Sequence, residues 1–402
     1  MNKQLMILLI GRIITNIADS LYMIATIWYV KTTTDSAFLI GLTSAIAMLP
    51  VTLQFLYGPM IDRFSKRKIL FFAEIGQGSL IAVISVLFFT NALWLPLLFF
   101  LMFLALALSE ATYPTESALI ESLSDKKDLT KVNSVFACSY QTLDIISDAI
   151  SGILIVFVGL GVIYVSNSIL LIGTGLLFLF YLKVPKSKKE DQTTSLKFLA
   201  QYKNDFIDGY QVIKKQHTLL NIMFGVIVIN VMATMGLAML PVISSNSAEF
   251  GFWLTAMSVG TLVGTVLASK LEHIPLNRIM PYTSLFSGVC WMVAFSQNDK
   301  TVYSYVLFGF AWIGIGLLAI FVQTIIQVNL PKGYLGIGFA FISSILGSLS
   351  PLGYFLGGLF GELSSGPLIL MLSGLGYFGF TIYFLVHPKL KKLNTNISTN
   401  FG

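Results

Sequence analysis

Charged residues and cysteines are both scarce in this chain. Only 11% of its 402 residues are Asp, Glu, Lys or Arg, whereas 55% are hydrophobic, and the mean hydropathy is +0.81. A soluble body of this size would need far more polar surface, so a water-soluble globular fold is excluded. The two cysteines, Cys138 and Cys290, both fall in expected helices, which predicts buried thiols and no disulfide framework.

Motifs that would indicate other chemistry are also missing. The chain has no Gly-Lys-Ser or Gly-Lys-Thr phosphate loop, so ATP is not the expected energy source. Its three histidines, His217, His273 and His387, are scattered and make no metal constellation, and no cofactor is expected. The run from Gly374 to Gly379 fits a dinucleotide pattern but lies inside an apolar stretch with no strand before it.

Twelve apolar runs are the main feature that is present. A helix of about 20 residues crosses the roughly 30 Å hydrocarbon core of a bilayer. The expected spans are 5–30, 37–57, 69–89, 93–112, 132–157, 161–182, 217–242, 250–269, 278–296, 301–329, 335–361 and 366–386. The sequence therefore predicts an all-α membrane protein with twelve transmembrane helices.

Lys and Arg are almost confined to every second gap between these runs. With the N-terminus inside, 22 of the 25 basic residues are cytoplasmic, only Lys31 and Lys300 face out, and Arg12 lies within the first run. Both termini are therefore predicted to be cytoplasmic. The first run is expected to be retained, because it carries Arg12 and Asp19 and lacks a clear cleavage site. The basic loops favour contact with anionic lipid and not with nucleic acid.

A polar segment at 184–216 divides the apolar runs into two sets of six. The expected domains are an N-terminal bundle at 1–183, this cytoplasmic linker with an amphipathic or solvated helix, a C-terminal bundle at 217–390, and a tail at 391–402. Two such pseudo-repeats are the arrangement of one large transporter class, which binds substrate near the midplane between them. The architecture thus predicts alternating access.

The loop between the second and third runs carries a family motif. Residues 58–68 read GPMIDRFSKRK, which resembles the signature Gly-x-x-x-Asp-Arg-x-Gly-Arg-Lys of the major facilitator superfamily, with Ser65 at the second glycine. The resemblance implies a gating loop that latches the inner ends of the two bundles together. The alternative is a plain basic loop that sets orientation. The gating residues are expected to be Gly58, Asp62, Arg63 and Arg67.

A narrower resemblance extends over essentially the whole chain. The turn at 35–37, the motif Tyr-Pro-Thr at 113–115 and the run PLGYFLGGLFGEL at 351–363 look like the macrolide-efflux branch of bacterial drug:proton antiporters. This resemblance implies a monomeric protein of the bacterial plasma membrane that exchanges amphipathic drugs or endogenous products for protons. The chain departs from the antiporter pattern at 147–152, which lacks the usual proline, and at 335–338, which lacks an arginine.

Five carboxylates fall inside the expected spans, and Arg12 alone opposes them. An ionised acid at membrane depth costs about a few kcal/mol, so each must face the protein interior and be paired, hydrated or protonated. One arginine cannot pair with them all, which favours proton or cation binding. They are Asp19, Glu74, Glu110, Asp144 and Asp148.

The first run places several of its polar residues on one stripe. Arg12, Asn16, Asp19 and Met23 follow helical spacing, so this stripe is expected to line a central cavity. Arg12 and Asp19 lie about 10 Å apart along the axis. Arg12 is therefore expected to find a partner on another helix, among Asp144, Asp148 and Glu110.

Proton coupling is assigned to Asp19, Asp148, Asp144 and Arg12. Asp144 and Asp148 lie one turn apart on the fifth expected helix, where their repulsion favours a proton on one of them, and Asp19 or Asp148 is the expected coupling acid. Alternatively, these acids merely hold the first and fifth helices together. Glu74 lies near the basic loop, which favours a structural role, and Glu116 and Glu362 are expected to be helix caps or gate contacts.

A cavity with surplus negative charge favours a cationic or protonatable substrate. Its apolar contacts would come from Met and aromatic residues, which adapt to varied shapes, although each of these could instead face lipid. The expected cavity residues are Asn16, Met23, Glu110, Asn230, Thr234, Trp312 and Gln323.

The leading hypothesis is a secondary active exporter of amphipathic, cationic small molecules that works by proton antiport. A proton and the cargo would compete for the same negative charge, which couples their movements. A nutrient symporter of the same fold and a non-transporting immunity or sensor protein are the two alternatives.

Overall fold

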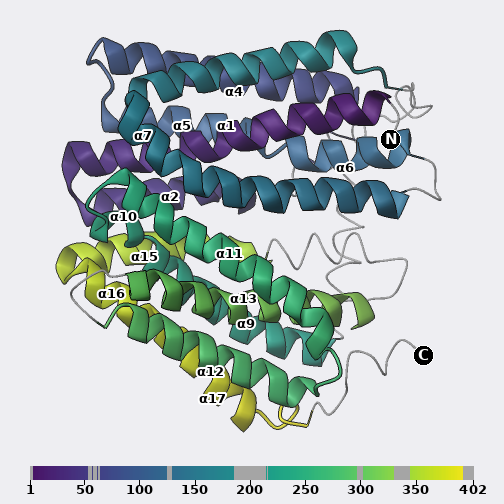
Figure 1. The fold of residues 1–402 in the computed structure, drawn as a ribbon, viewed down its shortest axis with the longest axis vertical. Helices are drawn as coiled ribbons and strands as arrows, with labels where there is room; N and C mark the ends of the chain where they lie inside the picture. The colour runs from purple at the N-terminus through teal and green to yellow at the C-terminus, as the bar shows by residue number, and fades with distance from the viewer. Residues whose placement is uncertain are drawn as a thin grey trace. The chain divides into compact units, whose positions relative to one another are not determined.

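The computed structural model describes residues 3–52, 57, 61, 64–124, 129–184, 214, 216–296, 302–329 and 345–392. The regular structure in these residues is helical, and neighbouring helices run lengthwise beside one another (Figure 1). Within the described part of the chain, eight helices are long and apolar enough to cross a membrane. The prediction of an all-α membrane protein is confirmed, whereas the number of twelve spans stays a prediction.

Helices in the first half of the chain begin and end close to the expected spans. Asp35 and Asn91, which follow α1 and α4, adopt the left-handed conformation with φ of 51° and 53°. Asp and Asn tolerate this conformation, which stops a right-handed helix. The helices are α1 (Lys3–Thr34), α2 (Ala37–Thr52), α4 (Lys66–Phe89), α5 (Leu95–Ser109), α6 (Thr112–Leu123) and α7 (Leu129–Tyr181).

Helix α7 is two helices joined at Gly159. This glycine has φ 78° and ψ 162°, a conformation that an L side chain rarely adopts. The break falls between the expected fifth and sixth spans, at 132–157 and 161–182. The backbone conformation of Gly159 therefore separates two apolar helices without a polar loop.

The second half contains eight helices among the described residues. The expected seventh span is divided between α9 and α10, with Pro241 in the first turn of α10, and the expected twelfth is divided at Gly374. The helices are α9 (His217–Leu237), α10 (Leu240–Ile243), α11 (Ser247–Leu271), α12 (Leu276–Ala294), α13 (Val302–Asn329), α15 (Ser350–Leu363), α16 (Gly366–Ser373) and α17 (Leu375–Val386).

Internal contacts divide the chain into two units. Unit 1 comprises Met1–Thr33, Ile46–Gln201 and Asn246–Gly251, and unit 2 comprises Thr34–Ala45, Tyr202–Ser245 and Phe252–Gly402. Helix α2 therefore begins in unit 2 and ends in unit 1.

Unit 2 is built around an aromatic cluster. Trp253 and Trp291 are both fully buried and pack on Phe308 with ring centroids 5.5 and 5.0 Å away. The indole of Trp291 donates a 2.7 Å hydrogen bond to the backbone carbonyl of Leu370. This bond satisfies the one polar atom of a large buried ring and ties α12 to α16.

Candidate functional site

Unit 1 has a row of polar side chains between α1 and α4. The Thr15 hydroxyl donates a 3.0 Å hydrogen bond to Oε1 of Glu74, and the Gln77 amide donates a 2.6 Å bond to Oδ1 of Asp19. Thr15 and Asp19 are four residues apart on α1, and Glu74 and Gln77 are three apart on α4, so each pair lies on one helix face. The two helices thus contact through a two-rung ladder of polar groups.

Asp19 accepts hydrogen bonds on both carboxylate oxygens, and both donors are neutral. Its Oδ2 accepts a 2.9 Å bond from the hydroxyl of Ser109, the last residue of α5. The Gln77 amide nitrogen can only donate, whereas the Ser109 hydroxyl can donate or accept. A proton on Oδ2 would therefore be donated to Ser109 Oγ, and the Asp19 carboxyl keeps both hydrogen bonds in either protonation state.

Glu74 is fully buried on the same face of α4. Its Oε1 accepts from Thr15, whereas its Oε2 has no hydrogen-bond partner among the described residues. The Thr15 hydroxyl, like that of Ser109, can reverse its direction. Glu74 therefore belongs to the same polar row as Asp19. The sequence favours a structural role for Glu74 near the basic loop, and its place in this row is an additional feature.

Arg12 forms an ion pair with Glu116, which is not among the partners expected from the sequence. Its Nε lies 3.5 Å from Oε2 of Glu116, and its guanidinium lies 5.0 Å from the centroid of the Tyr140 ring. The Tyr140 hydroxyl donates a 3.1 Å hydrogen bond to the same Glu116 oxygen. Glu116 is only 1% exposed, so this ion pair is buried.

Among the described residues, the salt-bridge partner of Arg12 is neither Glu110 nor Asp148. The sequence places Glu116 beyond the fourth span, but α6 starts again directly after α5, and the two helices together form one candidate span at Leu95–Ile120. Glu116 is thereby brought into the core of unit 1, inside α6, and the expectation that it caps a helix is wrong, whereas its role as a gate contact stays a prediction.

Charge in this network is unbalanced. Asp19, Glu74 and Glu116 bring three buried or part-buried carboxyl groups together with one cation, Arg12. A single arginine compensates at most one carboxylate, and an uncompensated buried charge is costly. The network therefore has more carboxyl groups than its one described cation can compensate.

Residues expected to line the cavity in unit 2 lie mostly against neighbouring helices. Asn230 donates a 3.2 Å hydrogen bond to the carbonyl of Leu346, and Thr234 packs against Gly353 of α15. Trp312 is part-buried beside the aromatic cluster, 6.2 Å from the Trp291 ring centroid, whereas Gln323 is exposed.

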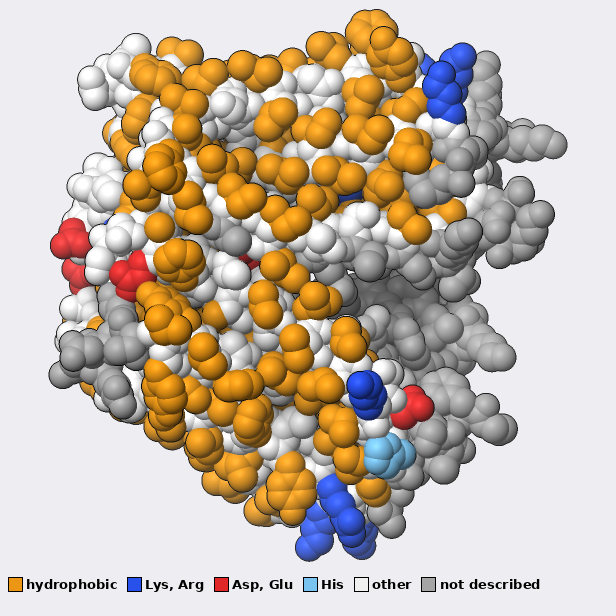
Figure 2. Space-filling model, in the orientation of Figure 1, with side chains coloured by type: hydrophobic (Ala, Val, Ile, Leu, Met, Phe, Trp, Pro, Cys, Tyr) orange, Lys and Arg blue, Asp and Glu red, His pale blue; other side chains and the backbone are white. Residues whose placement is uncertain are grey.

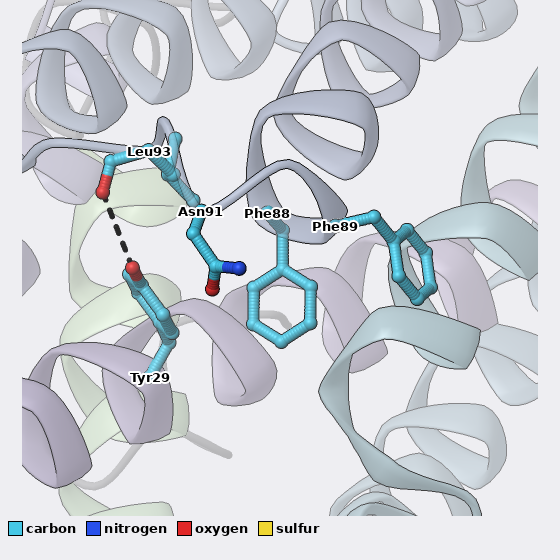
Figure 3. Close-up of a pocket in the computed structure, with 5 residues that line it drawn as sticks. All are labelled: Tyr29, Phe88, Phe89, Asn91 and Leu93. Atoms are coloured by element: carbon cyan, nitrogen blue, oxygen red, sulfur yellow. Dashed lines mark hydrogen bonds between the residues drawn. The ribbon is translucent and has the colours of Figure 1, made fainter.

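A small pocket of about 310 Å³ lies beside the turn between α4 and α5. The Tyr29 hydroxyl points toward the backbone carbonyl of Leu93 and donates to it at 3.3 Å, while Phe88, Phe89 and Asn91 complete the lining (Figure 3). None of the described residues that line this pocket is Asp, Glu, Lys or Arg. These residues therefore do not offer the charge that recognition of an ionic cargo needs.

In unit 2, a carboxylate caps the start of α2. Oε2 of Glu362 accepts 3.0 Å hydrogen bonds from the backbone N–H of Phe38 and from the Ser36 hydroxyl. A Cβ on Gly41 would lie 2.5 Å from the Cα of Gly358, so α2 and α15 approach too closely here for any larger residue. Glu362 therefore caps a helix, as the sequence suggests, but the helix belongs to another part of the chain.

The sequence matches the family profile described as Major Facilitator Superfamily over residues 8–354. The chain belongs to the Major Facilitator Superfamily. It is therefore a multi-pass membrane transporter of small molecules in a lipid environment and not an enzyme. The resemblance of the loop at 58–68 is confirmed at the level of the superfamily.

Solved structures share the superfamily fold at low sequence identity. A POT family transporter in complex with a thioalcohol-conjugated peptide has a TM-score of 0.73 and 12% identity, with 96% of each chain covered. A bacterial homologue of the iron transporter ferroportin, in an inward-facing state, has a TM-score of 0.70 and 18% identity, covering 97% of this chain and 99% of that one. A bacterial homologue of the human lysosomal transporter Spinster, inward-facing and unoccupied, has a TM-score of 0.67 and 14% identity, covering 95% and 97%. No curated relative matches the chain in sequence.

Several residues assigned from the superfamily motif and the expected spans fall outside the described structure. These are Gly58, Asp62 and Arg63 of the gating loop and the side chain of Asp144. Arg67 is part-buried in the first turn of α4. Asn16, Met23, Glu110 and Asp148 are part-buried in unit 1.

Five residues of the network are not predicted from the sequence to belong to it, although Glu116 is named there as a helix cap or gate contact. Their shared signal is a polar side chain within or beside an apolar run, and Gln77 additionally lies one turn after Glu74. Such residues are individually common in membrane helices, so the signal is weak without the partner helix. They are Thr15, Gln77, Ser109, Glu116 and Tyr140.

Replacing Glu362 with alanine should free the Phe38 amide. We expect hydrogen–deuterium exchange at this amide to rise about fivefold, the usual size of a lost helix-cap hydrogen bond. The exchange is measured by mass spectrometry on the peptide that contains Phe38. Glu272→Ala, which removes another exposed acid of unit 2, is the matched control and should leave this amide unchanged.

The same contact should respond to acid. The N–H of Phe38 is the largest cause that lowers the pKa of Glu362, and the Ser36 hydroxyl acts in the same direction. Since the pKa is lowered, the contact is fully present above the ordinary glutamate value of about 4.3 and is lost as pH falls through the lowered pKa. Loss of protection at near-neutral pH would contradict this assignment.

Proposed function

We propose that this transporter exports amphipathic, cationic small molecules in exchange for protons. The observation that supports this best is Asp19, a part-buried acid whose described hydrogen-bond donors, Gln77 and Ser109, are both neutral. An acid whose described hydrogen bonds come from neutral donors is suited to bind a proton or a positively charged cargo in turn. The proposal includes twelve spans in two six-helix repeats with both termini cytoplasmic.

Competition at Asp19 supplies the coupling. A deprotonated Asp19 attracts a cationic cargo, and a proton that arrives from outside neutralises the carboxyl and weakens the grip on the cargo. The Ser109 hydroxyl reverses its hydrogen bond when Oδ2 takes the proton, so the exchange needs no rearrangement of the helices that hold Asp19. Glu74, one turn away on α4 from Gln77, places a second carboxyl group in the same region.

The resemblance to the macrolide-efflux branch supports export rather than uptake. Its motifs lie at both ends of the chain, and the surplus of carboxylates fits cationic amphipaths better than anionic nutrients. The surplus of carboxylates therefore supports a cationic cargo, and the resemblance to the macrolide-efflux branch supports export as the direction of transport.

Binding of a cationic dye should release protons from the purified protein. We expect rhodamine 6G or ethidium, added to detergent-purified protein in weak buffer, to acidify the solution, because the cargo displaces a proton from Asp19. The measurement is a pH-indicator titration against the amount of bound dye. Asp19→Asn should reduce the release, while Asp35→Asn, an exposed acid after α1, should not.

Transport measurements in proteoliposomes distinguish antiport from symport and from a protein that does not transport. Antiport moves the dye and the protons in opposite directions, whereas a symporter moves both in the same direction. Proton release that is equal for a neutral amphipath of similar size, or dye binding without any proton movement, would contradict the proposal.

A further inference from the structure

Unit 2 carries a second charged site, at the end of the bundle where α12 begins and α17 ends. A groove of about 390 Å³ lies there, with Arg278 and Lys391 among its lining residues. Arg278 is in the first turn of α12, and Lys391 follows α17. Figure 2 shows basic side chains gathered at this end of the bundle beside apolar surface.

Both cations are available to an external anion. Arg278 and Lys391 are exposed, and neither forms an ion pair with another described residue. Lys389 and Lys392 flank Lys391 in the sequence and add to the positive potential. Two cations that line one groove favour an anion with several acceptor oxygens, such as a phosphate.

Asn277 adds a polar contact of a different kind. Its amide nitrogen donates a 3.1 Å hydrogen bond to the backbone carbonyl of Lys391, which holds the segment after α17 against α12. Its Oδ1 is a buried acceptor with no partner among the described residues. Asn277 therefore fixes the position of the Lys391 backbone beside α12.

Below the cations the groove becomes apolar. Tyr282 and Leu285 follow Arg278 at intervals of four and three residues, so they continue its face of α12. Tyr282 is 67% exposed, and Leu385 of α17 is 52% exposed. Charge at one end and an open apolar surface at the other match an amphiphile that stands along the helices.

We propose that this groove binds an anionic phospholipid. The phosphate lies between Arg278 and Lys391, and the acyl chains follow Tyr282, Leu285 and Leu385. The positive-inside pattern places the groove at the cytoplasmic leaflet, where basic pockets between helices bind such headgroups. A free phosphate would use the cations and leave the apolar surface uncovered. This proposal is independent of the cargo and of proton exchange.

Native mass spectrometry of the full-length protein in detergent tests the site. We expect phosphatidylglycerol to remain bound and to raise the melting temperature, whereas phosphatidylcholine and inorganic phosphate do not. The double variant Arg278→Gln/Lys391→Gln should bind phosphatidylglycerol about 30-fold more weakly, since each basic group near the membrane surface contributes roughly fivefold.

A matched variant separates a specific site from general charge attraction. Lys68→Gln/Lys270→Gln also removes two positive charges, at exposed positions that do not line the groove, and should keep the wild-type affinity. Equal loss in the two double variants would overturn the site. Equal binding of phosphatidylcholine, or equal stabilisation by inorganic phosphate, would overturn the assignment to an anionic lipid. Leu385→Ser should weaken phosphatidylglycerol binding without affecting any response to phosphate.

Discussion

Asp19→Asn is expected to uncouple cargo binding from pH. In the wild-type protein, a proton and a cationic cargo exclude each other at Asp19, so acidification should lower dye affinity by about 5- to 150-fold, the usual range of coupling between two ligands. Asparagine keeps the hydrogen bonds to Gln77 and Ser109 but cannot bind the proton, so dye affinity in the variant should hardly change with pH. Equilibrium dye binding to purified protein at several pH values measures the effect.

Transport should fail in the same variant for the same reason. Everted vesicles that contain Asp19→Asn are expected to lose dye efflux driven by a proton gradient while they still exchange dye down its own gradient. Asp148→Asn is a parallel test, because Asp148 is the second acid predicted to couple. If both variants keep proton-driven efflux at the wild-type rate, the coupling acid lies elsewhere.

Ser109→Ala distinguishes a proton site from a simple structural acid. The variant removes the one described partner of Asp19 that can both donate and accept. We expect a shift in the pH at which dye affinity falls, because Asp19 loses the partner that accepts its proton. The protein should stay folded, because the Gln77 hydrogen bond remains. A purely structural Asp19 would instead give a change in thermal stability without a change in the pH profile.

Glu74→Gln addresses the acid that is fully buried on α4. Glutamine retains the contact with Thr15, and its amide group carries no charge. If Glu74 shares the proton with Asp19, this variant shifts the pH dependence in the same assay without abolishing it.

Much of the fold could be predicted because the bilayer imposes a length on each apolar run. The spans on α1, α4 and α12 are close to the observed helices, and the stripe that contains Arg12 and Asp19 faces into a polar network. Helix periodicity alone predicts which residues share a face. It does not predict which helix lies opposite that face.

The partner of Arg12 shows why the rest could not be predicted. An acid that follows a run of apolar residues is expected outside the membrane, so the sequence predicts a helix cap or a gate contact at Glu116. Its burial depends on the turn at residues 110–111, after which α6 continues the path of α5 within one candidate span. The sequence shows that an acid is present at position 116, but it does not show that the helix continues past the turn at 110–111.

Arg12→Met is expected to cause the largest loss of stability among these variants. The change leaves Glu116 buried without its cation, and breaking a buried ion pair from one side costs about 3–5 kcal/mol. Tyr140 still donates its hydrogen bond to Glu116, but one neutral donor does not replace a guanidinium. Unfolding in mixed detergent micelles at increasing dodecyl sulfate measures the loss.

The double variant Arg12→Met/Glu116→Leu should recover most of this stability. Replacing both members of a buried pair with apolar residues is often nearly neutral, because neither charge has to be desolvated. Together with Glu116→Leu alone, the three variants form a double-mutant cycle that gives the interaction energy of the pair. Additive effects would show that Arg12 and Glu116 do not stabilise each other. A double variant that is stable but has lost the pH dependence of dye affinity would assign the Arg12–Glu116 pair a part in coupling. The bundle would then be intact, while the electrostatic field at Asp19 had changed.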